Sequence, residues 1–189
     1  MPIEQHPLQP FLPQNGKILM LGSFPPQKKR WVIDFFYPNF TNDMWRIFGI
    51  VFFNNALHFV DTKAKTYRKD AIVDFLNTTG IGIFDTATAV RRLQDNASDK
   101  FLEIVTPTDI KALLRKMPQC HTIVTTGQKA TDTICHDFNI AQPPIGHYTE
   151  FNIDSLELRL YRMPSTSRAY PLAITKKAVF YQQMFNEVL

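Results

Sequence analysis

Strand-like and helix-like patterns alternate along this chain, and that alternation limits the possible folds more than any other feature. Short apolar runs at residues 17–23, 81–84 and 121–126 predict buried strands, and residues 156–163 alternate apolar and polar side chains as a further strand. Helical patterns are predicted over residues 42–55, 66–77, 106 onward, 129–138 and 174–188. The alternation predicts an α/β fold, a three-layer α/β/α sandwich with a mostly parallel central sheet.

The clearest helix start in the sequence is Thr106-Pro107-Thr108-Asp109. It places Thr at the cap, Pro at the first helical position and an acid three residues after the cap. Residues 1–16, which are rich in Pro and Gln, are predicted to be an irregular arm, and residues 17–189 a single domain.

Composition narrows the class of protein without naming it. Of the 189 residues, 44% are apolar and 20% are charged, as in an ordinary folded domain. The net charge of +4 permits a polyanionic partner without requiring one. Two cysteines cannot build a disulfide framework, and no segment offers about 18 uninterrupted apolar residues, so we expect a cytoplasmic protein with no membrane partner.

Three loops follow predicted strands: residues 22–25, 126–128 and 164–168. In open parallel sheets a ligand lies beyond the carboxyl ends of the strands. We therefore expect these loops to share one site.

Several large enzyme classes lack their signatures here, because the sequence has no GxxxxGK[ST], GxGxxG, HExxH or GxSxG motif. The five histidines have no metal-ligand spacing, so we assign no metal. His147 alone lies in a loop that could approach the site.

The individual motifs allow two interpretations each. The basic and aromatic loop at residues 27–41 suits either stacked bases or a loop pinned into the core. Asn42 suits either a ligand contact or a helix cap, and Asp85 could orient a loop or satisfy backbone amides. The segment 164–168 suits either phosphate contacts or a solvated turn.

Five motifs in this order and spacing carry a resemblance to a known family. They read Ile18-Leu-Met-Leu-Gly-Ser-Phe-Pro-Pro26, Phe36-Tyr37-Pro-Asn-Phe-Thr-Asn42-Asp-Met-Trp45, Gly80-Ile-Gly-Ile-Phe-Asp85, Thr126-Gly-Gln-Lys-Ala130 and Leu160-Tyr-Arg-Met-Pro-Ser-Thr-Ser167. Together they resemble the uracil-DNA glycosylase superfamily, most closely its branch of hypoxanthine (deoxyinosine) and mismatch-type uracil glycosylases.

The resemblance implies a monofunctional DNA glycosylase that needs no cofactor. It would hydrolyse the N-glycosidic bond of a deaminated or mismatched base, uracil or hypoxanthine, after turning the nucleotide out of the DNA stack. The implied partner is DNA that contains such a base, and we expect a monomer.

The resemblance also assigns roles to residues. The first motif, Gly22, Ser23, Phe24 and Pro25, would bind the base, with Phe24 or Tyr37 stacked on it and Asp85 at the pocket. Asn42 would hold a water molecule or hydrogen-bond the base, with Asp43 as its acidic neighbour. The residues assigned to the DNA strand are Ser165, Thr166, Ser167, Arg168 and Lys129.

The sequence departs from the family pattern in three places. Residues 38–41 replace the His-Pro-Arg that relatives tend to carry, the first motif ends in Pro26 rather than Gly, and it lacks the water-activating Asp. Asp43 or Asp34 could substitute for that acid. Two other functions therefore stay open: a catalytically silent nucleic-acid-binding module of the same fold, and a small-molecule hydrolase or nucleotide-binding enzyme.

Overall fold

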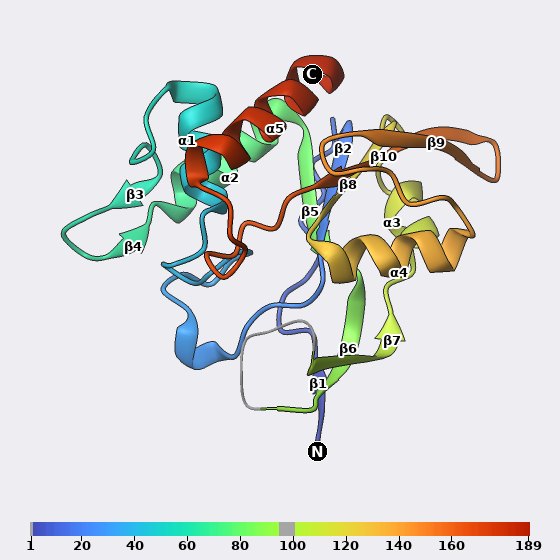
Figure 1. Ribbon diagram of the computed structural model, residues 1–189, viewed down its shortest axis with the longest axis horizontal. Coiled ribbons are helices and arrows are strands. Elements are labelled where there is room, and N and C mark those ends of the chain that lie inside the picture. The colour runs from blue at the N-terminus through green and yellow to red at the C-terminus, as the bar shows by residue number, and fades with distance from the viewer. Residues whose placement is uncertain (1, 95–100) are drawn as a thin grey trace.

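A five-stranded sheet forms the centre of the protein in the computed structural model, which describes residues 2–94 and 101–189. The strands lie in the order β5 (Ile81–Asp85), β2 (Ile18–Gly22), β8 (Thr122–Thr126), β10 (Leu156–Met163) and β9 (Tyr148–Ile153). The first four are parallel, and β9 is antiparallel to β10 (Figure 1). The mostly parallel sheet predicted from the sequence is confirmed.

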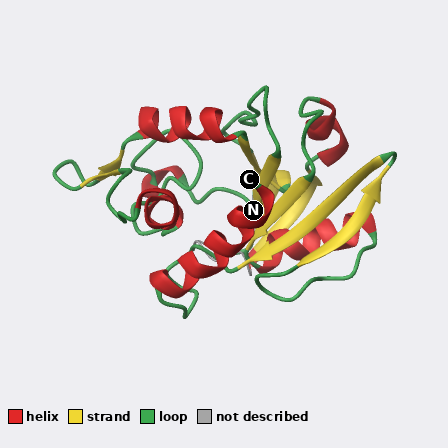
Figure 2. Ribbon diagram, turned by 90° about the horizontal axis from the view of Figure 1, so that it is seen from above, coloured by secondary structure: helices red, strands yellow, loops and turns green. Residues whose placement is uncertain are grey.

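Helices cover both faces of this sheet. Figure 1 shows α1 (Met44–Phe53), α2 (Lys69–Thr79) and α5 (Ile174–Val188) on one side, and α3 (Ile110–Arg115) and α4 (Gln128–Phe138) on the other. Figure 2 shows the same layers from above. The first group packs through aromatic rings, because the centroid of Phe48 lies 5.4 Å from Phe185 and 6.0 Å from Phe75.

Smaller elements surround the central sheet. An antiparallel sheet in the order β1-β6-β7 combines β1 (Ile3–Gln5), β6 (Ala87–Arg92) and β7 (Leu102–Pro107). A short hairpin pairs β3 (Val60–Asp61) with β4 (Thr66–Tyr67), and a 3₁₀ turn spans Lys28–Arg30.

The N-terminal segment is more regular than the sequence predicted. Residues 3–5 form β1 and pair with β6, and Phe11 makes an isolated bridge to Ile83 of β5. The expectation of an irregular arm is wrong for residues 3–5, because long-range pairing supplies the order that their composition does not indicate.

The predicted helix start at Thr106 is also wrong. Thr106 and Pro107 end strand β7, where Pro107 lies opposite Ala87. Helix α3 begins at Ile110, and Asp109 caps it by accepting a hydrogen bond from the Ala112 N–H at 2.9 Å. The cap signal is real but acts three residues later, because pairing with β6 holds Thr106 and Pro107 extended.

Other predicted elements lie close to their observed bounds. Strand β10 and helix α5 match residues 156–163 and 174–188, while α1 and α2 differ from the predictions by two or three residues at each end. Among the described residues, no helix is both long and apolar enough to cross a bilayer.

Candidate active site

A cavity of about 140 Å³ lies where strands β2, β5 and β8 end. This is the sheet edge at which parallel α/β folds bind their ligands. Its lining includes the following residues predicted from the sequence: Gly22, Ser23, Phe24, Pro25, Tyr37, Asn42, Asp85, Ser165, Thr166 and Ser167. We refer to this cavity as the base pocket, because the resemblance assigns several of these residues to a base.

Gly22 and Asp85 meet at one wall of the base pocket. They lie opposite each other in the β2–β5 pair. A Cβ atom on Gly22 would lie 2.4 Å from Asp85 Oδ1 and 3.5 Å from the Tyr37 hydroxyl. Glycine is therefore needed at position 22 to let the carboxylate approach the backbone.

Asp85 has a partner that the sequence did not indicate, the imidazole of His6. His6 Nε2 lies 2.9 Å from Asp85 Oδ2, and the two side chains are 3% and 9% exposed. The Asp85 backbone carbonyl also accepts a hydrogen bond from the Thr108 hydroxyl at 2.7 Å. The strand end and the carboxylate are thus both held in place.

Aromatic rings form a second wall. Phe24 is buried, and its ring lies edge-on to His6 at 5.2 Å between centroids. Tyr37 has a φ of 48°, unusual for a bulky residue, and its hydroxyl lies 2.9 Å from Thr126 Oγ1. This strained backbone turns the tyrosine toward the ends of β2 and β8.

Arg92 lines the pocket beside Phe24, although no sequence motif singled it out. Its guanidinium lies 5.7 Å from the Phe24 ring centroid and donates to the Pro25 carbonyl at 2.6 Å. Its Nε also contacts both carboxylate oxygens of Glu4, at 3.0 and 3.1 Å. Arg92 therefore braces the first motif against the N-terminal segment.

Asn42 lies just before helix α1, and both of its candidate roles fit its geometry. Its Oδ1 accepts a hydrogen bond from the Met44 N–H at 2.9 Å, which satisfies a donor at the helix start, although Asp43 holds the N-cap position itself. Its backbone carbonyl accepts from the Tyr67 hydroxyl at 2.7 Å. A carboxamide oxygen has a second lone pair and the group also has an NH₂, so the cap leaves capacity for a ligand.

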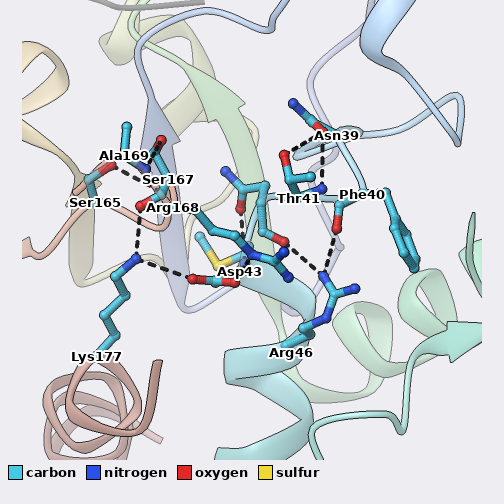
Figure 3. Close-up of polar contacts among 12 residues, drawn as sticks. Asn39, Phe40, Thr41, Asp43, Arg46, Ser165, Ser167, Arg168, Ala169 and Lys177 are labelled. Carbon is cyan, nitrogen blue, oxygen red and sulfur yellow. Dashed lines mark hydrogen bonds and ion pairs between the residues drawn. The ribbon is translucent and has the colours of Figure 1, made fainter. Parts of the chain in front are cut away.

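Asp43 does not line the base pocket, and its carboxylate lies in an ionic cluster with Arg168 and Lys177 (Figure 3). Its Oδ1 lies 3.0 Å from Arg168 Nε, and its Oδ2 lies 3.2 Å from Lys177 Nζ. Lys177 also donates to the Ser167 carbonyl at 2.8 Å. The carboxylate thus joins the start of α1 to the loop that carries Ser165–Arg168.

That loop is braced from several sides. The Asp43 N–H donates to the Thr166 carbonyl at 2.9 Å, and the Tyr181 hydroxyl donates to the Pro164 carbonyl at 3.0 Å. Complete burial raises the pKa of Tyr181, which keeps its hydroxyl protonated as a donor. The Ser167 N–H donates to Ser165 Oγ at 3.2 Å. The loop therefore presents a defined surface at the pocket rim.

A larger groove of about 870 Å³ adjoins the base pocket, and Asn39, Asn42, Ser165 and Ser167 line both. Four cationic side chains line the groove, together with Asp132: Arg30, Lys129, Arg162 and Arg168. The two basic residues that the resemblance assigned to DNA, Lys129 and Arg168, thus both line this groove. Its charge suits a phosphate backbone.

Two residues that the sequence analysis considered for the site, Asp34 and His147, line neither the base pocket nor the groove. Asp34 is 73% exposed, and an ion pair with Lys28 lowers the pKa of its carboxyl. Within the described residues, no three His, Cys, Asp or Glu side chains gather as metal ligands would.

Six residues that line the base pocket received no role of their own in the sequence analysis: Pro26, Phe36, Pro38, Asn39, Arg92 and Thr126. Phe36, Pro38 and Asn39 all belong to the second of the five motifs, residues 36–45, so that motif could have indicated them. Arg92 carried no such signal, because β6 was not predicted.

The fold and the pocket define a class: an α/β/α protein with a small ligand cavity at the carboxyl ends of its parallel strands. Within that class, the chain is similar in structure to a putative uracil DNA glycosylase from Methanosarcina acetivorans, whose structure was solved by solution NMR. The TM-score is 0.57 and the sequence identity 20%, over 96% of this chain and 99% of that one. This likeness shows a shared fold. No family model and no curated protein matches the sequence.

Proposed function

We propose that this protein is a monofunctional DNA glycosylase that removes a deaminated or mismatched base, uracil or hypoxanthine, from DNA. The observation that carries the proposal is the small pocket that opens beside a cationic groove, with Asn42 on their shared edge. The fold shared with the Methanosarcina acetivorans protein supports it. So do the five collinear motifs.

The size of the base pocket favours a single ring system. Its volume of about 140 Å³ is well below the roughly 300–1,000 Å³ of pockets for drug-sized ligands. A base turned out of the stack could lie against the ring of Phe24 or Tyr37, while the phosphates stay in the groove. Stacking of this kind offsets part of the cost of unstacking the base.

The reaction needs few groups. The bond between the base nitrogen and C1′ breaks, its electron pair leaves with the base, and a water oxygen bonds to C1′ while the water proton reaches the base. In our proposal Asn42 positions that water through the second lone pair of Oδ1. The positive end of helix α1, which begins beside it, favours negative charge nearby.

Asp43 takes a different role from the one considered from the sequence. Because Arg168 and Lys177 occupy its carboxylate, we propose that it positions the loop 165–168 rather than activating water. Arg168 and Lys129 would then bind phosphates, and Ser165, Thr166 and Ser167 would contact the strand next to the extruded base.

One observation favours the alternative of a silent DNA-binding module. The carboxylate of Asp43, the next residue after Asn42, pairs with Arg168 and Lys177, so this acid is not directed at the pocket to activate water. The alternative keeps the groove and the pocket but predicts no bond cleavage.

Single-turnover excision at low salt separates the two. Labelled duplexes carry one uracil, hypoxanthine, xanthine or mismatched thymine, and alkali then cleaves any abasic sites. Strand breaks at one lesion and not at its normal-base control support a glycosylase and identify its base. Retardation of the same DNA in a gel without breaks at any lesion supports the silent module.

A further inference from the structure

The N-terminal segment carries a buried histidine to the back of the base pocket. The backbone N–H of His6 donates to the Thr88 carbonyl at 2.8 Å, directly after the last residue of β1 that pairs with β6. Five residues later, Phe11 exchanges two backbone hydrogen bonds with Ile83, at 2.8 and 3.0 Å. Because the chain is tied down on both sides of His6, the imidazole has a fixed place behind Asp85.

The surroundings of the His6 ring keep one N–H directed at Asp85. Nδ1 lies 3.1 Å from the Leu8 nitrogen and 2.9 Å from the Leu8 oxygen. Neutral imidazole can accept from that N–H, and imidazolium can donate to that carbonyl. In both cases Nε2 can donate a hydrogen bond to Asp85 Oδ2, which lies 2.9 Å away.

The other oxygen of Asp85 is available to a ligand. Asp85 lines the base pocket, and its Oδ1 approaches Gly22 so closely that a Cβ there would lie 2.4 Å away. No residue that the structure describes donates a hydrogen bond to Oδ1. An ionised carboxylate only accepts hydrogen bonds, so the pocket wall presents an acceptor without a donor.

We propose that His6 holds the Asp85 carboxylate in place as a group that only accepts hydrogen bonds, and that this carboxylate selects the base. Bases with a ring N–H on the Watson–Crick edge would bind, and bases with a ring lone pair there would be rejected. The inference rests on the proposed function and deepens it. Deamination changes N3 of cytosine and N1 of adenine from lone-pair acceptors into N–H donors. A fixed carboxylate therefore separates the deaminated base from its parent, because the parent would leave two acceptors facing each other.

The test measures binding rather than cleavage. Duplexes carry an uncleavable 2′-fluoroarabino nucleotide of hypoxanthine or of adenine, and the ratio of the two dissociation constants is the readout. We expect the wild type to prefer hypoxanthine by at least about tenfold. In Asp85→Asn the carboxamide can both donate and accept, so the ratio should fall toward one.

Variants of His6 test its positioning role. His6→Leu removes the N–H and should lower the preference toward that of Asp85→Asn, whereas His6→Gln keeps a side-chain N–H and should retain most of it. His136→Leu is the matched control, because that side chain is 90% exposed on α4. A thermal unfolding midpoint for each variant separates misfolding from altered recognition.

The outcomes are distinct. A wild-type ratio near one overturns the inference, as does a full preference in a folded His6→Leu. If His6→Leu does not fold, a full preference in Asp85→Asn overturns it instead. Preference for hypoxanthine without excision of any base supports the inference and contradicts the proposed function. Excision of a base without a binding preference for hypoxanthine contradicts the inference and supports the proposed function.

Discussion

The ammonium group of Lys177 lies 3.2 Å from Asp43 Oδ2, and the two side chains are only 0% and 7% exposed. The pair joins helix α5 to the start of helix α1, 134 residues apart in the chain. Arg168, on the rim of the groove, contacts the other carboxylate oxygen of Asp43, so two cations share one carboxylate. The loop that borders the base pocket is thus anchored by buried charges, and its position depends on both helices.

Lys177→Met should destabilise the protein by about 2–3 kcal/mol, because it removes buried charged hydrogen bonds to Asp43 and to the Ser167 carbonyl, while Arg168 still pairs with the Asp43 carboxylate. Urea unfolding measures the effect. Lys111→Met is the control. It breaks an ion pair with Asp154 whose side chains are 47% and 69% exposed, and should change stability by less than about 1 kcal/mol. Equal losses in the two single variants would contradict the anchoring role.

Arg168→Ala and Lys129→Ala should each weaken DNA binding about equally for damaged and normal duplexes. Each should also reduce the slope of log K against log salt by about 0.9, as expected for one lost phosphate contact. Fluorescence anisotropy over a range of salt concentrations gives the slope. Arg115→Ala, in the last turn of α3, should leave it unchanged. An unaltered slope in both groove variants would remove the groove as the DNA site.

Gly22→Ala should reduce excision at least about tenfold, because its Cβ would lie 2.4 Å from Asp85 Oδ1, whose carboxylate His6 holds in place. Gly82→Ala is the matched control in β5. Its Cβ would lie 2.9 Å from the flexible end of Met117, so it should cost stability but not activity per folded molecule. Rates and unfolding midpoints of both variants are compared. Equal activity in the two would show that the approach of Asp85 to Gly22 does not matter.

Burial raises the pKa of the Cys120 thiol to about 11. In the unfolded chain the thiol ionises at about 8.5. Between these values the unfolded state loses its proton and the folded state keeps it, so stability falls as pH rises from about 9 to about 11. The wild type should lose about 2–3 kcal/mol more than Cys120→Ala over this window, measured by urea unfolding. Parallel pH profiles of the two proteins would contradict the assignment.

Local patterns predicted the parts of the fold that depend on local sequence. The alternation in residues 156–163 and the helical spacing in 174–188 match β10 and α5, since each pattern places a full row of apolar side chains on one face. The cap signal at Thr106 failed because the sequence does not show that β6 would pair with it. Propensity is a weak guide where a distant strand supplies the hydrogen bonds.

The candidate site also has one part that local sequence patterns predict and another part that depends on distant contacts. Gly22 and Asp85 end strands and Asn42 precedes a helix, so their place at one sheet edge could be predicted from the alternating pattern. The contacts of His6 with Asp85, and of Lys177 with Asp43, join residues 79 and 134 positions apart. A lone histidine in a Pro-rich segment and a lysine within a helix carry no local sign of such partners.

The most direct test of the central claim compares the wild type with Asn42→Ala on a duplex that contains hypoxanthine or uracil. Single-turnover excision and the dissociation constant are measured on the same DNA, with the exposed Asn186→Ala as control. If Asn42 positions the water, excision falls at least about tenfold while affinity stays nearly unchanged. Equal losses of rate and affinity, or rates at background for wild type and variant alike, would contradict the account.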